Sequence, residues 1–325
     1  MTETPAVRAP QSRSAGWVSS GIRGAGVWLA LAAALLVGLL LSPEIVASEQ
    51  LTVIARQAAP LGLLALGQAV VVIGRGFDLS VGGVVAIVNV LAAGLVVGPG
   101  GATVVVAACL LVGAAVGAVN GIGVVLGRIS PLIMTLGMTF VLSGAVLIFT
   151  GGAPTGNVPT EIRALSSARL AGIPVAVLIW LSVAIILAVV LRGSRPGRYL
   201  YARGSSPVAA RLSGVPVARV ELLSYVVSGV CAALGGVLLA GFVGSGSLGA
   251  GQDLMLQSLA AVVIGGITFV GGKGGVTGSV GGALFLTLVG ALLTGLGAGK
   301  AGNLVAQGVV LAAAAALYRN GRVGQ

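Results

Sequence analysis

Long apolar segments alternate with short polar ones along most of the chain. Several of these segments are shorter than the roughly 20 residues that a helix needs to cross a bilayer. We therefore expect some helices to extend into flanking glycine and polar residues, and others to be broken. The third segment is the strongest candidate for a broken helix, because Gly82, Gly83 and Asn89 interrupt it. The pattern predicts ten spans, at residues 27–41, 58–73, 81–97, 103–126, 132–149, 173–191, 222–243, 254–270, 276–296 and 303–317.

The composition agrees with this pattern. Hydrophobic residues make up 57% of the 325 residues and charged residues 8%, which is typical of an all-α polytopic integral membrane protein and not of a soluble domain. The two cysteines, Cys109 and Cys231, lie in apolar segments, and the chain has no histidine. These features indicate no disulfide framework, no metal site and no cofactor.

The charge distribution predicts an orientation in the membrane. A net charge of +11 does not indicate a nucleic acid partner here, because the arginines lie between apolar segments. Lys and Arg are enriched instead in the short cytoplasmic loops of membrane proteins. With the N-terminus inside, ten spans place fourteen basic residues on the cytoplasmic side and four on the outer side. We therefore predict a multi-pass membrane protein, embedded in lipid, with both termini in the cytoplasm.

The two ends of the chain are polar. Residues 1–26 are rich in proline and serine, and we predict a disordered cytoplasmic arm there. The segment 27–41 could alternatively be the core of a signal peptide, since Val-Ala-Ser at 46–48 loosely fits a cleavage site. The long polar arm before it and the spans after it favour an uncleaved first helix. The predicted transmembrane permease domain then covers residues 27–318, and residues 319–325 form a cytoplasmic tail.

The longest polar interruption is the segment 192–221, which holds six of the eighteen basic residues. This segment contains the signals of a short helix. Ser206 can act as its N-cap and Pro207 suits the first helical position. Gly214 can end the helix about two turns later.

Two interpretations of this segment are open. Val208 and Leu212 are spaced i and i+4, so they share one face of the predicted helix, which favours contact with a partner protein. An arginine-rich loop can also serve only to fix the topology and to meet anionic lipid headgroups. A loop of the second kind needs no capped helix.

Catalytic and ion-coupling chemistry is sparse. No predicted span carries a charged residue near its middle, and Asp78 and Asp253 lie at span ends. This argues against an ion-coupled secondary carrier, which needs carboxylates in its pathway, and against an intramembrane protease. Lys273, in a Gly-Gly-Lys-Gly sequence, lacks the glycine spacing and the Ser or Thr of a phosphate-binding loop. We therefore predict that the chain is not an enzyme and has no ATPase site of its own.

Uncharged polar residues do occur inside the predicted spans. In hydrocarbon such groups hydrogen-bond between helices or face a water-filled cavity, and both interpretations are open for each residue. Small residues at Gly113, Gly117 and Gly121 allow helices to approach closely. Taken together, these features predict tightly packed helices around a permeable path. The polar residues are Gln68, Asn89, Asn120, Thr135, Ser143, Ser228, Gln257 and Thr287.

Four segments in collinear order carry a family resemblance. They are GFDLSVGG at 76–83, GRISPLIMTLG at 127–137, SPVAARLSGV at 206–215, and AAVVIGG followed by GGKG between 260 and 274. They resemble the GIDLSVG, P-x-I-x-T-L-G, NPEAARLSGI and AAVVIGG…GG+G segments of the ribose-type (monosaccharide) permeases, the membrane subunits of bacterial ABC importers. The resemblance extends over residues 50–318. The chain departs from the family at Val208, where Glu is frequent, which puts one polar contact to the ATPase in doubt.

The resemblance implies a type II-like ABC importer permease that moves a monosaccharide or a similar small uncharged solute into the cytoplasm. The implied partners are cytoplasmic ABC ATPase subunits, an extracytoplasmic solute-binding protein, and a second permease copy or a homologous permease. Alternatives are an ion-coupled secondary carrier, a permease of the same family for a non-sugar solute, and a structural or regulatory subunit without a pathway.

The interpretation as an ABC importer permease yields two groups of candidate residues. One group would line the substrate pathway, and the other would form a coupling helix that docks on the ATPase. For Asp78 an alternative is a surface ion pair with Arg75, three residues earlier, if the two lie at helical spacing. The pathway candidates are Gln68, Asp78, Ser80, Asn89, Asn120 and Thr135, and the coupling candidates are Pro207, Val208, Ala209, Ala210, Arg211, Leu212 and Gly214.

Overall fold

Helices account for nearly all of the regular structure. A computed structural model describes residues 15–95, 101–153, 156–299, 301–302, 304–305 and 308–309. Within these residues the only strands are β1 and β2, which form a two-stranded antiparallel hairpin with Arg169 opposite Pro174. The elements are α1 (Ala15–Leu41), η1 (Pro43–Val46), α2 (Ser48–Ile73), α3 (Val81–Gly94), α4 (Ala102–Val125), α5 (Pro131–Thr150), α6 (Thr160–Ser167), β1 (Arg169–Leu170), β2 (Ile173–Pro174), α7 (Val175–Gly193), α8 (Arg195–Ser205), α9 (Pro207–Leu212), α10 (Val217–Val243), α11 (Gln252–Ile264) and α12 (Val276–Gly295).

The all-α class is confirmed, but the number of ten spans is not. Among the described residues, six helices are long and apolar enough to cross a membrane: α2, α4, α5, α7, α10 and α12. Shorter apolar helices are α3, α11 and the part of α1 at Gly26–Leu41. The predicted span 303–317 lies mostly outside the described residues. Helix α1 begins at Ala15, inside the predicted arm 1–26, whose residues 1–14 also lie outside the described part.

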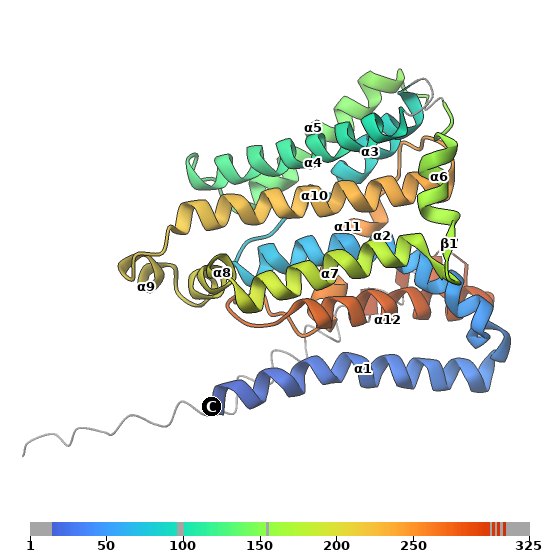
Figure 1. Ribbon diagram of the computed structural model, residues 1–325, viewed down its shortest axis with the longest axis horizontal. Helices are drawn as coiled ribbons and strands as arrows, with labels where there is room; N and C mark the ends of the chain where they lie inside the picture. The colour runs from blue at the N-terminus through green and yellow to red at the C-terminus, as the bar shows by residue number, and fades with distance from the viewer. Residues whose placement is uncertain are drawn as a thin grey trace, which may run out of the picture.

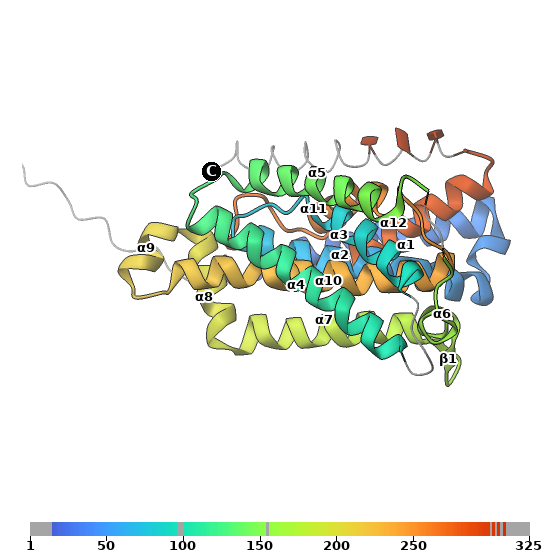
Figure 2. The same cartoon turned by 90° about the horizontal axis from the view of Figure 1, so that it is seen from above.

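Helices α2 and α10 form the centre of the bundle. Most of α2 is buried, whereas α5 is largely exposed along its length. In Figure 1, α10 and α2 run side by side, with α4 and α5 beyond one of them and α7, α12 and α1 beyond the other. Figure 2 shows α5 on one side of the bundle and α7 on the other. Because all of these helices are apolar, the difference in their burial reflects their position in the bundle and not their composition.

Glycines allow α4 to pack directly against the backbone of α10. A Cβ atom added at Gly113 would lie 2.4 Å from the carbonyl oxygen of Gly229, and one at Gly117 would lie 2.3 Å from that of Tyr225. Neither position has room for any side chain. The predicted close approach at these small residues is confirmed, and it uses the packing that is common between membrane helices.

Two short helices lie in the interior, and each is joined to a non-helical segment. Helix α3 has 14 residues and follows the non-helical stretch 74–80. The third span is therefore short, but the predicted interruption at Gly82, Gly83 and Asn89 is wrong, because these residues lie inside the helix. Helix α11 has 13 residues, and the predicted span 254–270 is wrong after Ile264. The chain leaves the helix there because Gly265 and Gly266 follow, and Gly266 has a positive φ of 88°, which favours glycine.

The two ends of the bundle differ in structure. Helices α8 and α9 lie at one end, and α6 with the β1–β2 hairpin lies at the opposite end (Figure 1). Contacts agree with this picture: Gly272 at the first end donates to the carbonyl oxygen of Ile73 (2.8 Å), while Val158 at the second end donates to that of Gly244 (3.1 Å). We call these the α9 end and the α6 end.

Candidate functional site

The non-helical stretch 74–80 brings polar groups into the interior of the bundle. It turns sharply at Arg75, whose φ is 71°, and Gly76 N donates to Val71 O (2.9 Å). Arg75 is exposed, while Asp78 and Ser80 are buried. The predicted surface ion pair between Arg75 and Asp78 is wrong, because the two residues are not helical, Arg75 is exposed and Asp78 is buried.

Asp78 and Ser80 form a local hydrogen-bonded turn at the beginning of α3. The backbone N–H of Ser80 donates to Asp78 Oδ1 (3.0 Å), and its hydroxyl donates to the same oxygen (2.6 Å). Asn120 of α4 donates from Nδ2 to Ser80 Oγ (2.8 Å). Asp side chains commonly satisfy the backbone two residues later in this way. The turn thereby ties the start of α3 to α4.

Two further helices hold the same turn from other directions. Gln68 of α2 donates from Nε2 to the carbonyl oxygen of Asp78. On α5, Thr135 Oγ1 accepts from Leu79 N (3.0 Å), and Thr139 Oγ1 donates to Leu79 O (2.9 Å). Both backbone groups of Leu79 are therefore satisfied by side chains, as a non-helical segment inside a membrane protein requires.

Five of the six pathway candidates meet at this turn: Gln68, Asp78, Ser80, Asn120 and Thr135. Asn89 does not. Its Oδ1 accepts from the backbone N of Ser247 (2.8 Å), so it joins α3 to the loop after α10. Sequence reasoning missed Thr139, although its position one turn after Thr135 on a helix was an available signal.

Several buried polar atoms around the turn have no hydrogen bond within the described part of the protein. In proteins such atoms usually face water, an ion or a ligand. Here the Ser228 hydroxyl and the Tyr225 phenol, both on α10, lie close to the Asp78 carboxylate. We call these atoms together the polar cluster, and they belong to α2, α4, α10 and the turn before α3. The atoms are Gln68 Oε1, Asp78 Oδ2, Asn120 Oδ1, Tyr225 OH and Ser228 Oγ.

Asp78 also corrects the expectation that carboxylates lie only at span ends. The residue follows the end of α2 in sequence, yet its side chain is 1% exposed. A buried carboxylate persists in an apolar interior when hydrogen bonds satisfy it, and Ser80 supplies two of them. The sequence argument against ion coupling assumed that no carboxylate lies in the interior, and Asp78 contradicts that assumption.

The helix predicted within the segment 192–221 is confirmed. Ser206 is the N-cap of α9 and its Oγ accepts from Ala209 N (3.3 Å), Pro207 is the first helical residue, and Gly214 has a positive φ of 76°. Ala210 packs inward and is 4% exposed. Val208 and Leu212 point outward together and are 72% and 84% exposed.

Sequence reasoning missed a second helix in this segment, α8, although its start carries a similar signal. Ser194 is its N-cap and accepts from Gly197 N (3.3 Å), with Pro196 in the first turn. Arg203 of α8 forms a buried ion pair with Glu221 of α10. This pair joins α8 to the beginning of a helix that crosses the whole bundle.

Helix α8 is also joined to the loop between α11 and α12. A Cβ atom at Gly204 would lie 2.0 Å from Ile73 O and 2.5 Å from Gly272 N, so only glycine fits there. The Tyr201 hydroxyl donates to Gly274 O (2.9 Å). Burial raises the pKa of Tyr201, so the hydroxyl stays protonated and remains a donor near neutral pH. A displacement of α8 would therefore reach the glycine-rich loop 271–274.

Comparisons with known proteins agree on one family. The family described as "Branched-chain amino acid transport system / permease component" matches residues 50–315. The ribose import permease protein RbsC of Escherichia coli K12 is 35% identical over 83% of this chain and 86% of its own length. A probable ABC transporter permease of Sinorhizobium fredii is 34% identical over 80% and 78%. The autoinducer 2 import system permease protein LsrC of an Enterobacter species is 34% identical over 83% and 79%.

No solved structure matches the fold significantly.

Proposed function

Because the chain belongs to the family of permease components of branched-chain amino acid transport systems, we propose that it is the membrane permease subunit of an ATP-driven importer. Its cargo is a monosaccharide or a similar small uncharged solute, carried into the cytoplasm. Relatives named for the import of ribose and of autoinducer 2 support this range of cargo. The location is the cell (plasma) membrane, with both termini in the cytoplasm.

The polar cluster is the observation that supports transport of an uncharged polar solute. Its free atoms belong to amide, hydroxyl and phenol groups together with one carboxylate oxygen. Such groups exchange hydrogen bonds with water or with sugar hydroxyls at similar energy, so they suit a path that a hydrated solute crosses. The short helix α3 begins at this point, and half-helices with non-helical extensions are typical of transport sites.

The partners follow from the two ends of the bundle. We assign the α9 end to the cytoplasm, because it carries the arginine-rich segment 192–221. Cytoplasmic ABC ATPase subunits would dock on α9 through Val208 and Leu212, which are exposed at this end. An extracytoplasmic solute-binding protein would dock on the α6 end, and a second permease copy or a homologous permease would complete the path.

The proposed cycle uses the contacts of α8. ATP-driven closure of the ATPase pair displaces α9 and α8 together. The Arg203–Glu221 ion pair carries this displacement to α10, and the contacts at Tyr201 and Gly204 carry it to the loop before α12. Helices α10 and α12 then change their inclination, and the path opens alternately to the two sides.

Uptake by reconstituted complexes tests this function. The permease is placed in liposomes with a partner ABC ATPase and a solute-binding protein, and uptake of radiolabelled ribose and other neutral monosaccharides is measured. We expect uptake only with ATP, ATPase and binding protein together. Uptake driven by a proton or sodium gradient without the ATPase would instead establish a secondary carrier. ATP-dependent uptake of a non-sugar solute, without uptake of sugars, would support the importer mechanism and show that the proposed cargo is wrong.

A further inference from the structure

The unpaired atoms of the polar cluster are all oxygens. They belong to five side chains that are at most 1% exposed: Gln68, Asp78, Asn120, Tyr225 and Ser228. Oxygen atoms accept hydrogen bonds and bind hard cations. A buried group of them without donors therefore indicates an occupant that supplies protons or positive charge.

The hydrogen bonds around the turn fix the orientation of both amides. The Ser80 hydroxyl donates its proton to Asp78 Oδ1 (2.6 Å), so its oxygen can only accept from Asn120, which must present Nδ2 (2.8 Å). The carbonyl oxygen of Asp78 likewise accepts from Gln68 Nε2, because a carbonyl group cannot donate. Asn120 Oδ1 and Gln68 Oε1 are therefore acceptors that have no proton to offer.

Acceptors outnumber donors in the cluster. The Tyr225 phenol and the Ser228 hydroxyl lie close to the Asp78 carboxylate, and together they can donate two hydrogen bonds at most. If both donate to Asp78 Oδ2, the two amide oxygens still lack a donor. Leaving buried acceptors without partners is unfavourable, so the side chains of the cluster do not satisfy one another.

The cluster also carries a charge without a counter-charge. Asp78 forms no ion pair with a residue that the structure describes. The basic side chain that approaches Tyr225 is Arg203, and it is paired with Glu221. Arg75 belongs to the same turn but is exposed. A buried carboxylate needs a compensating charge, which a water molecule does not supply.

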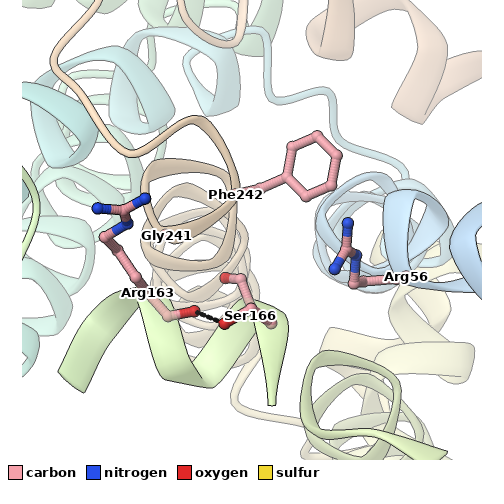
Figure 3. A pocket seen from close by; sticks show the side chains of 6 residues that line it. Arg56, Arg163, Ser166, Gly241 and Phe242 are labelled. Atoms are coloured by element: carbon pink, nitrogen blue, oxygen red, sulfur yellow. Dashed lines mark hydrogen bonds between the residues drawn. The ribbon is translucent and has the colours of Figure 1, made fainter. Parts of the chain in front are cut away.

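The pocket at the α6 end has the opposite character. It is lined by Arg56 of α2 and Arg163 of α6, and Figure 3 shows the Arg163 guanidinium turned away from Arg56. A pocket lined by two positive charges repels a further cation. Between these two groups of polar residues, only the polar cluster suits a cation.

We propose that the polar cluster binds one monovalent metal cation, for which Na⁺ is the probe. Asp78 Oδ2 supplies the negative charge, and the amide, hydroxyl and phenol oxygens complete the set of ligands. One carboxylate matches the charge of a monovalent ion, whereas Ca²⁺ or Mg²⁺ would leave an excess positive charge. Non-helical segments beside short helices hold Na⁺ in several transport proteins.

The bound ion would join three helices and the turn, because its ligands come from α2, α4, α10 and Asp78. The inference goes beyond the proposed function, in which the same cluster belongs to the path. An uncharged cargo cannot neutralise Asp78, and a cation can. Ion binding is measured without transport, so the inference can fail while the proposed function stands.

The test measures thermal unfolding of the purified full-length permease in detergent, in sodium chloride and in choline chloride at equal concentration, together with binding of radioactive Na⁺. Asp78→Asn removes the charge. Ser228→Ala removes one oxygen and breaks no hydrogen bond among the described residues. Ser279→Ala is the control, because Ser279 Oγ is also buried and unpaired within the described part of the chain but belongs to α12, outside the cluster.

We expect Na⁺ to raise the wild-type unfolding midpoint by roughly 2–4 °C relative to choline. Asp78→Asn should lose this shift and the binding of Na⁺, and Ser279→Ala should keep both. Ser228→Ala should weaken Na⁺ binding by about tenfold, which corresponds to about 1.4 kcal/mol.

Equal wild-type midpoints in the two salts, with no Na⁺ bound, would overturn the inference and leave a protonated carboxyl group or a water molecule in the cluster. Na⁺ binding that persists in Asp78→Asn would also overturn it, because the ion would then lie elsewhere. If Asp78→Asn does not fold, Ser228→Ala decides: unchanged Na⁺ affinity in that variant contradicts the inference.

Discussion

Ser80 donates both its backbone N–H and its hydroxyl to the same carboxylate oxygen of Asp78, at 3.0 and 2.6 Å. The other carboxylate oxygen has no hydrogen bond within the described part of the protein. One oxygen thus holds the turn before α3, and we propose that the other acts in the substrate pathway. These two roles are separable by substitution.

Asp78→Asn is expected to impair transport while leaving the protein folded. The Asn side-chain oxygen can accept both hydrogen bonds from Ser80, so the turn is kept, but the charge at the free position is lost. Membrane level, thermal stability in detergent and ATP-dependent uptake should be measured together. Wild-type uptake by the variant would mean that Asp78 only supports the turn.

Ser80→Ala should act through stability. It removes the hydroxyl that joins Asp78 to Asn120 and leaves buried polar groups without partners, at a cost of about 1–3 kcal/mol. A lowered midpoint of thermal unfolding is the expected result. An unchanged midpoint would show that other groups replace the hydroxyl.

Thr139→Val should weaken the contact between α5 and the turn. The substitution removes the hydrogen bond to Leu79 O, and the expected loss is about 1 kcal/mol. Thr150→Val is the matched control, because Thr150 Oγ1 donates only to Val146 O of its own helix (2.8 Å). Equal effects of the two substitutions on thermal unfolding would contradict the role assigned to Thr139.

Tyr201→Phe should reduce coupling without reducing ATPase binding. The substitution removes the hydrogen bond to Gly274 O and leaves the exposed surface of α9 unchanged. We expect normal association with the ATPase and a smaller amount of solute moved per ATP hydrolysed. Because burial raises the pKa of Tyr201, wild-type coupling should not depend on this group between pH 6 and 9. An unchanged ratio of transport to hydrolysis in the variant would exclude the contact from the coupling route.

Much of the fold follows from local sequence signals. The cap of α9 was predictable because Ser206, Pro207 and Gly214 each have a strong positional preference. The shortness of α3 was predictable from the shortness of its apolar segment, but Gly82 and Gly83, taken as the interruption, are helical, and the break lies before Val81. Helix α8 was missed because its arginines made the segment look like a polar loop, although the helix is amphipathic. Helix α11 was predicted too long because Ile267 and Val270 continue the apolar run.

The polar cluster was only partly predictable. Sequence alone marked Gln68, Asn120 and Thr135 as polar residues inside apolar segments, and the family resemblance added Asp78 and Ser80. Their convergence depends on which helices become neighbours, and hydropathy does not determine that. Asn89 shows this limit of sequence reasoning: it is also a polar residue inside an apolar segment, but it bonds to the loop after α10 and does not join the cluster.

The central claim, that an ATPase drives this permease through α9, is tested most directly by Leu212→Asp. Leu212 and Val208 are exposed, and burying two such side chains in a partner would contribute roughly 1.5–3 kcal/mol each. The variant should insert and fold normally, because this face of α9 contacts solvent. Ala218→Asp, at an exposed position outside α9, is the control. The measurement is ATPase association together with ATP-dependent uptake in liposomes: the account predicts that Leu212→Asp loses both while Ala218→Asp keeps both, and full association with full uptake in Leu212→Asp would contradict it.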